Sequence, residues 1–278
     1  MAAKIFLNVY TIQKEWDTDP VGMLSEIKKM GYEGLEFSLN MEDALFEEVV
    51  AEMGRLGLQA VSTHIEIDDF IFRTDYYFNR ARKLGITNLV IPWLAENRVP
   101  GGADYAATKD KIRQLAILCA SKEFALSYHN HDFEFKKIDG ECKEDILLRD
   151  IPQMNAQLDV CWCTVGGSKP KDYIRRYGHR MPTLHLKDFS VKGDVAGAKL
   201  FDLLGETAAA DAAKTREKHG FSFQPIGLGQ VDFPAIFKAA DEAGVQWMLV
   251  EQDASPDRPP LEAARLSIEY IKANYKGA

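Results

Sequence analysis

Eight short β-rich runs alternate with longer helical runs from one end of the chain to the other, and no other feature constrains the fold as strongly. Alternating strands and helices are typical of right-handed βαβ units in a parallel sheet. Eight such units predict closure into a (β/α)8 TIM barrel, which commonly forms one domain of this length, residues 1–278. The predicted strands are Ile5–Tyr10, Gly34–Ser38, Ala60–Ile65, Asn88–Trp93, Ala125–Asn130, Ala156–Val160, Thr183–Lys187 and Trp247–Glu251.

The predicted helices carry recognisable start and stop signals. Asp19 and Pro20 begin one helix as a cap and a first-turn proline, and Gly31 ends it. The segments "KMGYEGLEF", "RLGLQAVSTHI", "KLGITNLVIPW" and "EAGVQWMLVEQD" repeat one pattern, in which a glycine separates a helix end from the next strand. An open doubly wound sheet is the alternative fold. It usually has fewer strands, and no G-x-G-x-x-G motif follows the first strand here.

One segment breaks this alternation. No clear strand is predicted between Asp188 and Asp232, where Ala196–Lys218 is alanine-rich and expected to be helical and "PIGLGQVDF" is glycine-rich. Because the segment follows the seventh strand, we expect residues 190–229 to be an insertion that covers the barrel mouth as a lid. A contact within an oligomer is the alternative interpretation.

Composition excludes several classes of protein. With 34 basic and 42 acidic residues the net charge is −8, which disfavours nucleic acid as a partner. No apolar run approaches the roughly 18 residues that span a bilayer, and no signal peptide begins the chain. The four cysteines have the spacing of neither a disulfide framework nor a zinc site. We therefore expect a soluble, cytoplasmic protein.

Polar side chains gather where the fifth predicted strand ends, in "SYHNHDFEF". His129 and His131 are two residues apart and share one face of the strand, and Glu134 follows just beyond it. Catalytic groups of a TIM barrel lie at the carboxyl ends of its strands. The cluster therefore predicts a metal or proton-transfer site, and hydrogen bonding of each histidine to a neighbouring backbone group is the alternative.

The next two strands also end in polar groups. Asp159 lies in the apolar run "NAQLDVCW", where a buried carboxylate needs a cation or hydrogen-bond donors. In "TLHLKDF", Leu184 and Leu186 share one face, and His185 and Lys187 share the other. If the leucines pack under the helices, the histidine and the lysine point into the barrel mouth, as a metal ligand beside an acid–base cation. A helix N-cap or a structural ion pair is the alternative for Asp159, and a salt bridge with Asp188 or a neighbour is the alternative for Lys187.

Glu251 ends the eighth predicted strand, in "WMLVEQD", where a closing ion pair with Lys187 is the alternative to a catalytic role. The ends of four consecutive predicted strands thus supply four candidate ligands, which are Glu134, Asp159, His185 and Glu251. Three carboxylates and one imidazole suit one divalent ion, Mn²⁺ before Mg²⁺, Co²⁺ or Zn²⁺, because carboxylate ligands favour hard cations.

Four further side chains are candidate substrate-binding residues. His64 lies near the end of the third strand, Glu36 near the end of the second and His129 near the end of the fifth, and Trp93 ends the fourth. A tryptophan at a barrel mouth can stack against a sugar ring, or it can fill the barrel. We therefore predict a small-molecule carbohydrate substrate, no nucleic-acid or membrane partner, and leave a homo-oligomer open.

At these motifs the chain resembles the sugar phosphate isomerase/epimerase family of xylose isomerase-like TIM barrels. The motifs are "MGYEGLEF", "VSTHI", "YHNHDFEF", "QLDVCW", "LHLKD", "IGLGQVDF" and "VEQD". The resemblance implies one divalent metal held by Glu134, Asp159, His185 and Glu251. Many members have a glutamate on the fifth strand where this chain has His129, so Glu134, His129 and His131 remain alternatives for that ligand. The "YHNHDFEF" variant resembles members that act on keto-sugars or inososes, including dehydratases.

These observations predict a divalent-metal-dependent isomerase or epimerase of a small sugar or keto-sugar that forms an enediolate. Glu251 or Glu134 would remove the proton beside the carbonyl, and His131 and Lys187 would stabilise the enediolate or carry protons. A lyase that expels water or an alcohol from the same enolate is the alternative. A non-catalytic sugar-binding barrel and an abasic-site endonuclease are further alternatives; six histidines and a charge of −8 disfavour the endonuclease.

Overall fold

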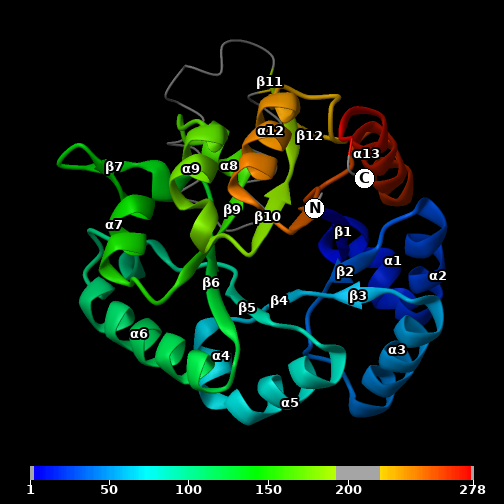
Figure 1. Ribbon diagram of the computed structural model, residues 1–278, viewed down its shortest axis with the longest axis horizontal. Coiled ribbons are helices and arrows are strands. Elements are labelled where there is room, and N and C mark those ends of the chain that lie inside the picture. Colours follow the sequence, from blue (N-terminus) through cyan, green and yellow to red (C-terminus); the bar gives the residue numbers. More distant parts are fainter. Residues whose placement is uncertain (1–2, 192–219, 277–278) are drawn as a thin grey trace.

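The computed structural model describes residues 3–191 and 220–276, and all eight predicted barrel strands are present in it (Figure 1). The third of them is divided into two parts, β3 and β4. The strands are β1 (Lys4–Asn8), β2 (Gly34–Glu36), β3 (Gln59–Ala60), β4 (Ser62–His64), β5 (Asn88–Ile91), β6 (Ala125–His129), β9 (Asn155–Asp159), β10 (Thr183–Leu186) and β13 (Trp247–Val250). The surrounding helices are α1 (Gln13–Thr18), α2 (Pro20–Met30), α3 (Asp43–Leu56), α4 (Ile67–Phe72), α5 (Thr74–Leu84), α6 (Tyr105–Ser121), α7 (Lys143–Asp150), α8 (Val160–Val165), α9 (Pro170–Tyr177), α12 (Phe233–Ala243) and α13 (Pro260–Asn274).

The strands form one parallel sheet in the order β3-β2-β1-β13-β10-β9-β6-β5-β4. The third barrel strand is interrupted at Val61, so its first part, β3, pairs with β2 and its second part, β4, pairs with β5. The two ends of the sheet are therefore parts of one strand, and the sheet forms a nearly closed barrel. The predicted TIM barrel is confirmed, and Figure 1 shows helices around the outside of the strands.

The helix signals in the sequence act as predicted. The Asp19 side chain accepts a hydrogen bond from the Gly22 amide at the start of α2, and Pro20 occupies the first turn. Four of the helices end at a glycine with positive φ, a conformation that costs glycine little. These glycines are Gly31, Gly57, Gly85 and Gly244.

The strand side chains alternate between two layers. Leu184 and Leu186 belong to the large apolar core between strands and helices. Thr183 and His185 point the other way, because they hydrogen-bond to side chains from other strands inside the barrel. The barrel interior is therefore largely polar, apart from a small separate cluster that contains Phe6, Val61 and Leu249.

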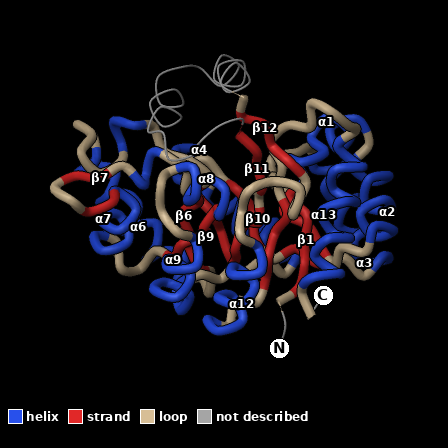
Figure 2. The backbone as a smooth tube through the Cα atoms, turned by 90° about the horizontal axis from the view of Figure 1, so that it is seen from above, coloured by secondary structure: helices blue, strands red, loops and turns tan. Residues whose placement is uncertain are grey.

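Two short antiparallel pairs were not predicted. β7 (Lys137–Ile138) pairs with β8 (Glu141–Cys142). β11 (Asp188–Val191) pairs with β12 (Phe221–Gln224), inside the stretch where no strand was expected. Figure 2 shows this second pair beside the barrel strands. Most of the proposed lid, including the helix expected over Ala196–Lys218, lies outside the described residues. None of the described helices has the length and apolar character to cross a membrane.

Candidate active site

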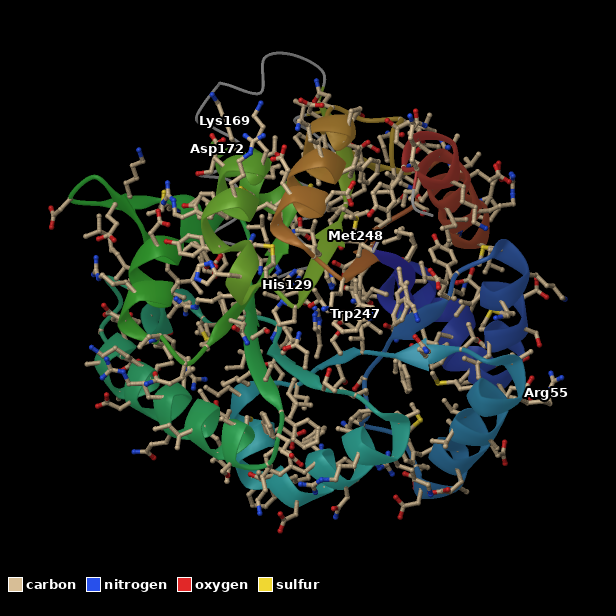
Figure 3. The ribbon with its side chains drawn as sticks, viewed as in Figure 1. Arg55, His129, Lys169, Asp172, Trp247 and Met248 are labelled. Atoms are coloured by element: carbon tan, nitrogen blue, oxygen red, sulfur yellow. The ribbon has the colours of Figure 1, made fainter. Side chains whose placement is uncertain are left out.

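Polar side chains from six barrel strands meet at the carboxyl ends of those strands. They line or adjoin a pocket of about 290 Å³, and Figure 3 shows one of them, His129, near the centre of the strands. The group consists of Glu36 on β2, His64 on β4, His129 on β6, Asp159 on β9, His185 on β10 and Glu251 directly after β13. All are buried except His64, which is partly exposed. The alternation seen in the sequence brings them together, because each has the inward position of its strand.

His185 joins two carboxylates across the barrel. Its Nε2 lies 2.8 Å from Glu36 Oε2, and its Nδ1 lies 3.0 Å from Glu251 Oε2. Burial by itself would lower the pKa of His185, but the two carboxylates outweigh it and raise the pKa to about 10. Burial likewise opposes ionisation of Glu36, yet His64 and His185 lower the pKa of its carboxyl to about 2.

Lys187 is a buried cation beside this pair. Its Nζ lies 3.0 Å from Asp159 Oδ2, 2.8 Å from Glu251 Oε2 and 2.8 Å from Asp253 Oδ1. Burial disfavours the ammonium, but Asp159, Asp253 and Glu251 raise the pKa of Lys187 well above its usual value. The ion pair that was the alternative for Glu251 is therefore present, and it lies within the pocket.

The fifth-strand residue that joins Asp159, His185 and Glu251 is His129. One ligand atom from each of these four residues lies within 4.8 Å of the others, and all four residues are buried. His129 Nε2 is 3.8 Å from Asp159 Oδ2, the oxygen that also pairs with Lys187. Burial lowers the pKa of His129 well below its usual value.

The donor set fits a divalent ion. Two imidazoles and two carboxylates match Zn²⁺, Co²⁺ or Mn²⁺, and His129, Asp159, His185 and Glu251 would hold the ion. The expectation of Mn²⁺ depended on three carboxylates, so this set removes the reason to prefer it over Co²⁺ or Zn²⁺.

Glu134 lies elsewhere, in contrast to the expectation that it joins the metal ligands. Its carboxylate accepts hydrogen bonds from the Tyr128 hydroxyl and, at 2.9 Å, from the His131 amide. Tyr128 belongs to the apolar core outside the barrel, because it occupies the outward position next to His129. A side chain bound to it is therefore directed away from the pocket. Burial raises the pKa of Glu134 to about 8.

The remaining predicted residues line the pocket at different depths. His64 Nε2 lies 2.7 Å from Gln157 Oε1, and its ring stacks on His185 with the ring centres 5.4 Å apart. The His131 ring is 5.4 Å from that of His129. Trp93 lies at the outer end of the pocket with 44% of its surface exposed.

Sequence reasoning missed three residues of this site. Asp253 pairs with Lys187, Asn8 donates to Glu36, and Gln157 contacts both His64 and His129. For two of them, the spacing in the sequence could have identified the residue. Asp253 is two residues after Glu251, and Gln157 is two residues before Asp159 on the same face of its strand.

The comparisons with known proteins agree with this fold. The family model for the xylose isomerase-like TIM barrel matches residues 24–274, and the chain belongs to that family. Among solved structures, a sugar phosphate isomerase/epimerase from Parabacteroides distasonis has a TM-score of 0.74 at 20% identity, with 100% of this chain and 96% of that chain covered. A 3-keto-D-glucoside 4-epimerase from E. coli has a TM-score of 0.67 at 14% identity, covering 98% and 99%. At these identities the structures show a shared fold.

Curated relatives at higher identity are named inosose dehydratase. The protein from Clostridium beijerinckii is 25% identical over 245 residues, which cover 87% of this chain and 71% of the relative. The protein from Clostridium botulinum strain Alaska E43 is 27% identical over 165 residues, covering 58% and 51%. The chain thus aligns with about half the length of the latter. The proteins that this chain resembles in sequence are named dehydratases, and those that it resembles in structure include a dehydratase and an epimerase.

Proposed function

We propose that this protein is a divalent-metal-dependent enzyme that removes the proton beside the ketone of a small keto-sugar or cyclic keto-polyol. The observation that supports this proposal is the buried group of His129, Asp159, His185 and Glu251, which lies against Lys187 in the pocket. A bound divalent ion would bind substrate oxygens as a Lewis acid and stabilise negative charge on them.

The pocket carries two kinds of proton-transfer group. Glu251 and Asp253, with Lys187 between them, lie after β10 and β13. His64, the last residue of β4, and His131, which follows β6, line the pocket from other strands. One of the two carboxylates would remove the proton, and Lys187 would donate a hydrogen bond to the enolate oxygen. One of the two histidines would then deliver a proton to the substrate.

Loss of water is the outcome that we propose for the enolate. In that step the electron pair of the enolate forms a carbon–carbon double bond, and the hydroxyl on the β-carbon takes one proton and leaves as water. The curated relatives named inosose dehydratase favour this outcome. Return of the proton to the carbon would instead give the epimer, which is the isomerase reaction expected first from the sequence. Both outcomes use the same residues up to the enolate.

The charge around the pocket supports a substrate without a phosphate group. Lys187 is the one lysine or arginine among the described residues that line the pocket, and three carboxylates already pair with it. A phosphate dianion would therefore meet mainly carboxylates and imidazoles there. A neutral polyol can instead donate its hydroxyl protons to the same carboxylates.

The test is incubation of the protein with Co²⁺, Mn²⁺ or Zn²⁺ and a panel of inososes, ketoses and keto-glycosides in deuterated water. We expect one inosose or keto-sugar to lose water, with a metal-dependent increase in absorbance from the unsaturated product. Deuterium uptake with formation of an epimer would support the isomerase instead. Metal binding without turnover of any panel member, and without deuterium exchange, would contradict both and favour a sugar-binding protein.

A further inference from the structure

Gln157 lies at the centre of the barrel, beneath the proposed metal ligands. It is fully buried on β9, and its side chain points inward because it is two residues before Asp159. Its amide reaches side chains from four other strands. These are Glu36 on β2, His64 on β4, His129 on β6 and Thr183 on β10.

The direction of each hydrogen bond in this network follows from groups that can only donate or only accept. The Tyr10 N–H can only donate, and it donates to Asn8 Oδ1 at 2.9 Å. The Asn8 Nδ2 group must therefore face Glu36, and it donates to Oε2 at 2.8 Å. The carboxylate of Glu36 only accepts, so it is the Nε2 group of Gln157 that donates to Glu36 Oε1, at 3.0 Å. The amide orientation of Gln157 is fixed in this way.

The oxygen of Gln157 consequently faces two histidines. Its Oε1 lies 2.7 Å from His64 Nε2 and 3.1 Å from His129 Nδ1. A carbonyl oxygen only accepts, so both of these ring nitrogens must carry a proton. A neutral imidazole carries one proton, which leaves His129 Nε2 with a lone pair. That nitrogen is the one that faces Asp159 Oδ2 at 3.8 Å.

We propose that Gln157 is a positioning residue that sets the tautomers of two histidines, with the proton of His129 on Nδ1 and that of His64 on Nε2. The lone pair of His129 Nε2 is then available to the ion, whereas that of His64 Nε2 is not. Two groups in the described structure could hold an ion, one with His64, His129 and His185 and one with His129, Asp159, His185 and Glu251. His129 belongs to both groups, so its Nε2 lone pair is available to an ion at either one, whereas His64 could enter the first group only through Nδ1. This consequence rests on the metal dependence proposed above, whereas the tautomers themselves do not.

The first test needs no metal and no substrate. Long-range ¹⁵N–¹H spectra of the metal-free full chain distinguish the two imidazole tautomers, and the six histidines can be assigned by substituting them one at a time. We expect His129 to have its proton on Nδ1 and His64 on Nε2. A proton on His129 Nε2 would overturn the proposal, even if no Gln157 variant folds.

The second test compares two substitutions that alter the same amide. Gln157→Leu removes the shared oxygen at similar volume, so we expect His129 to become a mixture of tautomers and Co²⁺ affinity to fall about 10- to 100-fold. Thr183→Val is the matched control, because it removes the other acceptor of Gln157 Nε2, at 2.9 Å, and leaves the oxygen in place. It should keep the wild-type tautomers.

The results separate this proposal from the proposed function. Wild-type tautomers and Co²⁺ affinity in Gln157→Leu would overturn the positioning role, and so would equal effects of the two substitutions. If the wild-type protein binds no divalent ion, the metal-dependent function is overturned, and the tautomers in the metal-free protein still decide the role of Gln157. Co²⁺ absorption bands report the ligands directly, without any measurement of turnover.

Discussion

The two faces of the strand β10 are equally buried but chemically opposite. On β10, Leu184 and Leu186 are 0% exposed and pack in the core under the helices. Thr183 and His185 on the same strand are also 0% exposed, yet they point into a polar interior. Burial therefore does not distinguish the part of the strand that stabilises the fold from the part that forms the site.

The difference lies in what each face requires of its neighbours. An apolar side chain in the outer layer needs only contact and volume, so substitutions that conserve volume are tolerated there. A polar side chain inside the barrel needs a partner of the right polarity, because an unpaired buried polar group is destabilising. The inner face is thus a connected network, in which His185 and Lys187 bridge carboxylates from several strands.

The largest expected effect is a loss of turnover when a residue of the inner face is substituted. Glu251→Gln removes a carboxylate that contacts both His185 and Lys187, and we expect turnover to fall about 10³-fold, which corresponds to about 4 kcal/mol. The free energy of unfolding should change little, because Lys187 keeps Asp159 and Asp253 as partners. Steady-state kinetics and urea denaturation would measure the two quantities. Near-wild-type turnover would contradict the role of Glu251.

The reciprocal change is on the outer face. Leu184→Ala leaves a cavity in the core next to His185, and we expect a loss of about 3 kcal/mol in the free energy of unfolding, with retained metal affinity. Urea denaturation and metal titration of the same preparation would test this. A variant that keeps its stability but loses the metal would show that the two faces are not separable.

The outer face was predictable from the sequence, and the inner face was predictable in part. The period of two in "TLHLKDF" assigned Leu184 and Leu186 to the core and His185 and Lys187 to the mouth, as the structure shows. Asp159 and Glu251 were identified differently, as carboxylates at the ends of apolar runs. Glycines at four helix ends marked the boundaries, because few other residues adopt positive φ at low cost.

The remainder depended on contacts that sequence spacing does not contain. Glu134 lies beyond the end of β6, where the alternation stops, so nothing in the sequence indicated that it would turn back to Tyr128. The orientation of the Gln157 amide follows from its contact with the Glu36 carboxylate, which is far away in the sequence. The strands β7 and β8 have two residues each, which is too few to show a period.

A third prediction decides which fifth-strand residue serves the metal. A divalent ion at 100 times its dissociation constant should raise the free energy of unfolding by about 2.7 kcal/mol. Asp159→Asn should abolish this increment, and a chelator should reverse it in the wild type. Glu134→Gln should keep the increment, because the Glu134 carboxylate is bonded to Tyr128 and the His131 amide. Loss of the increment in Glu134→Gln would restore Glu134 as the ligand.

The smallest expected effect concerns Trp93, at the rim where the polar interior meets solvent. Its side chain is 44% exposed and lines the pocket, so it can cover one face of a substrate ring without contacting the proposed metal ligands. An aromatic contact of this kind contributes about 1 kcal/mol, and Trp93→Ala should therefore raise KM about fivefold and leave kcat unchanged. Phe72→Ala is the matched control, because Phe72 is 86% exposed at the end of α4 and does not line this pocket. Steady-state kinetics of both variants with the substrate found in the panel would measure the difference. An equal rise in KM for both variants, or a fall in kcat confined to Trp93→Ala, would show that the rim does not act as a separate binding surface.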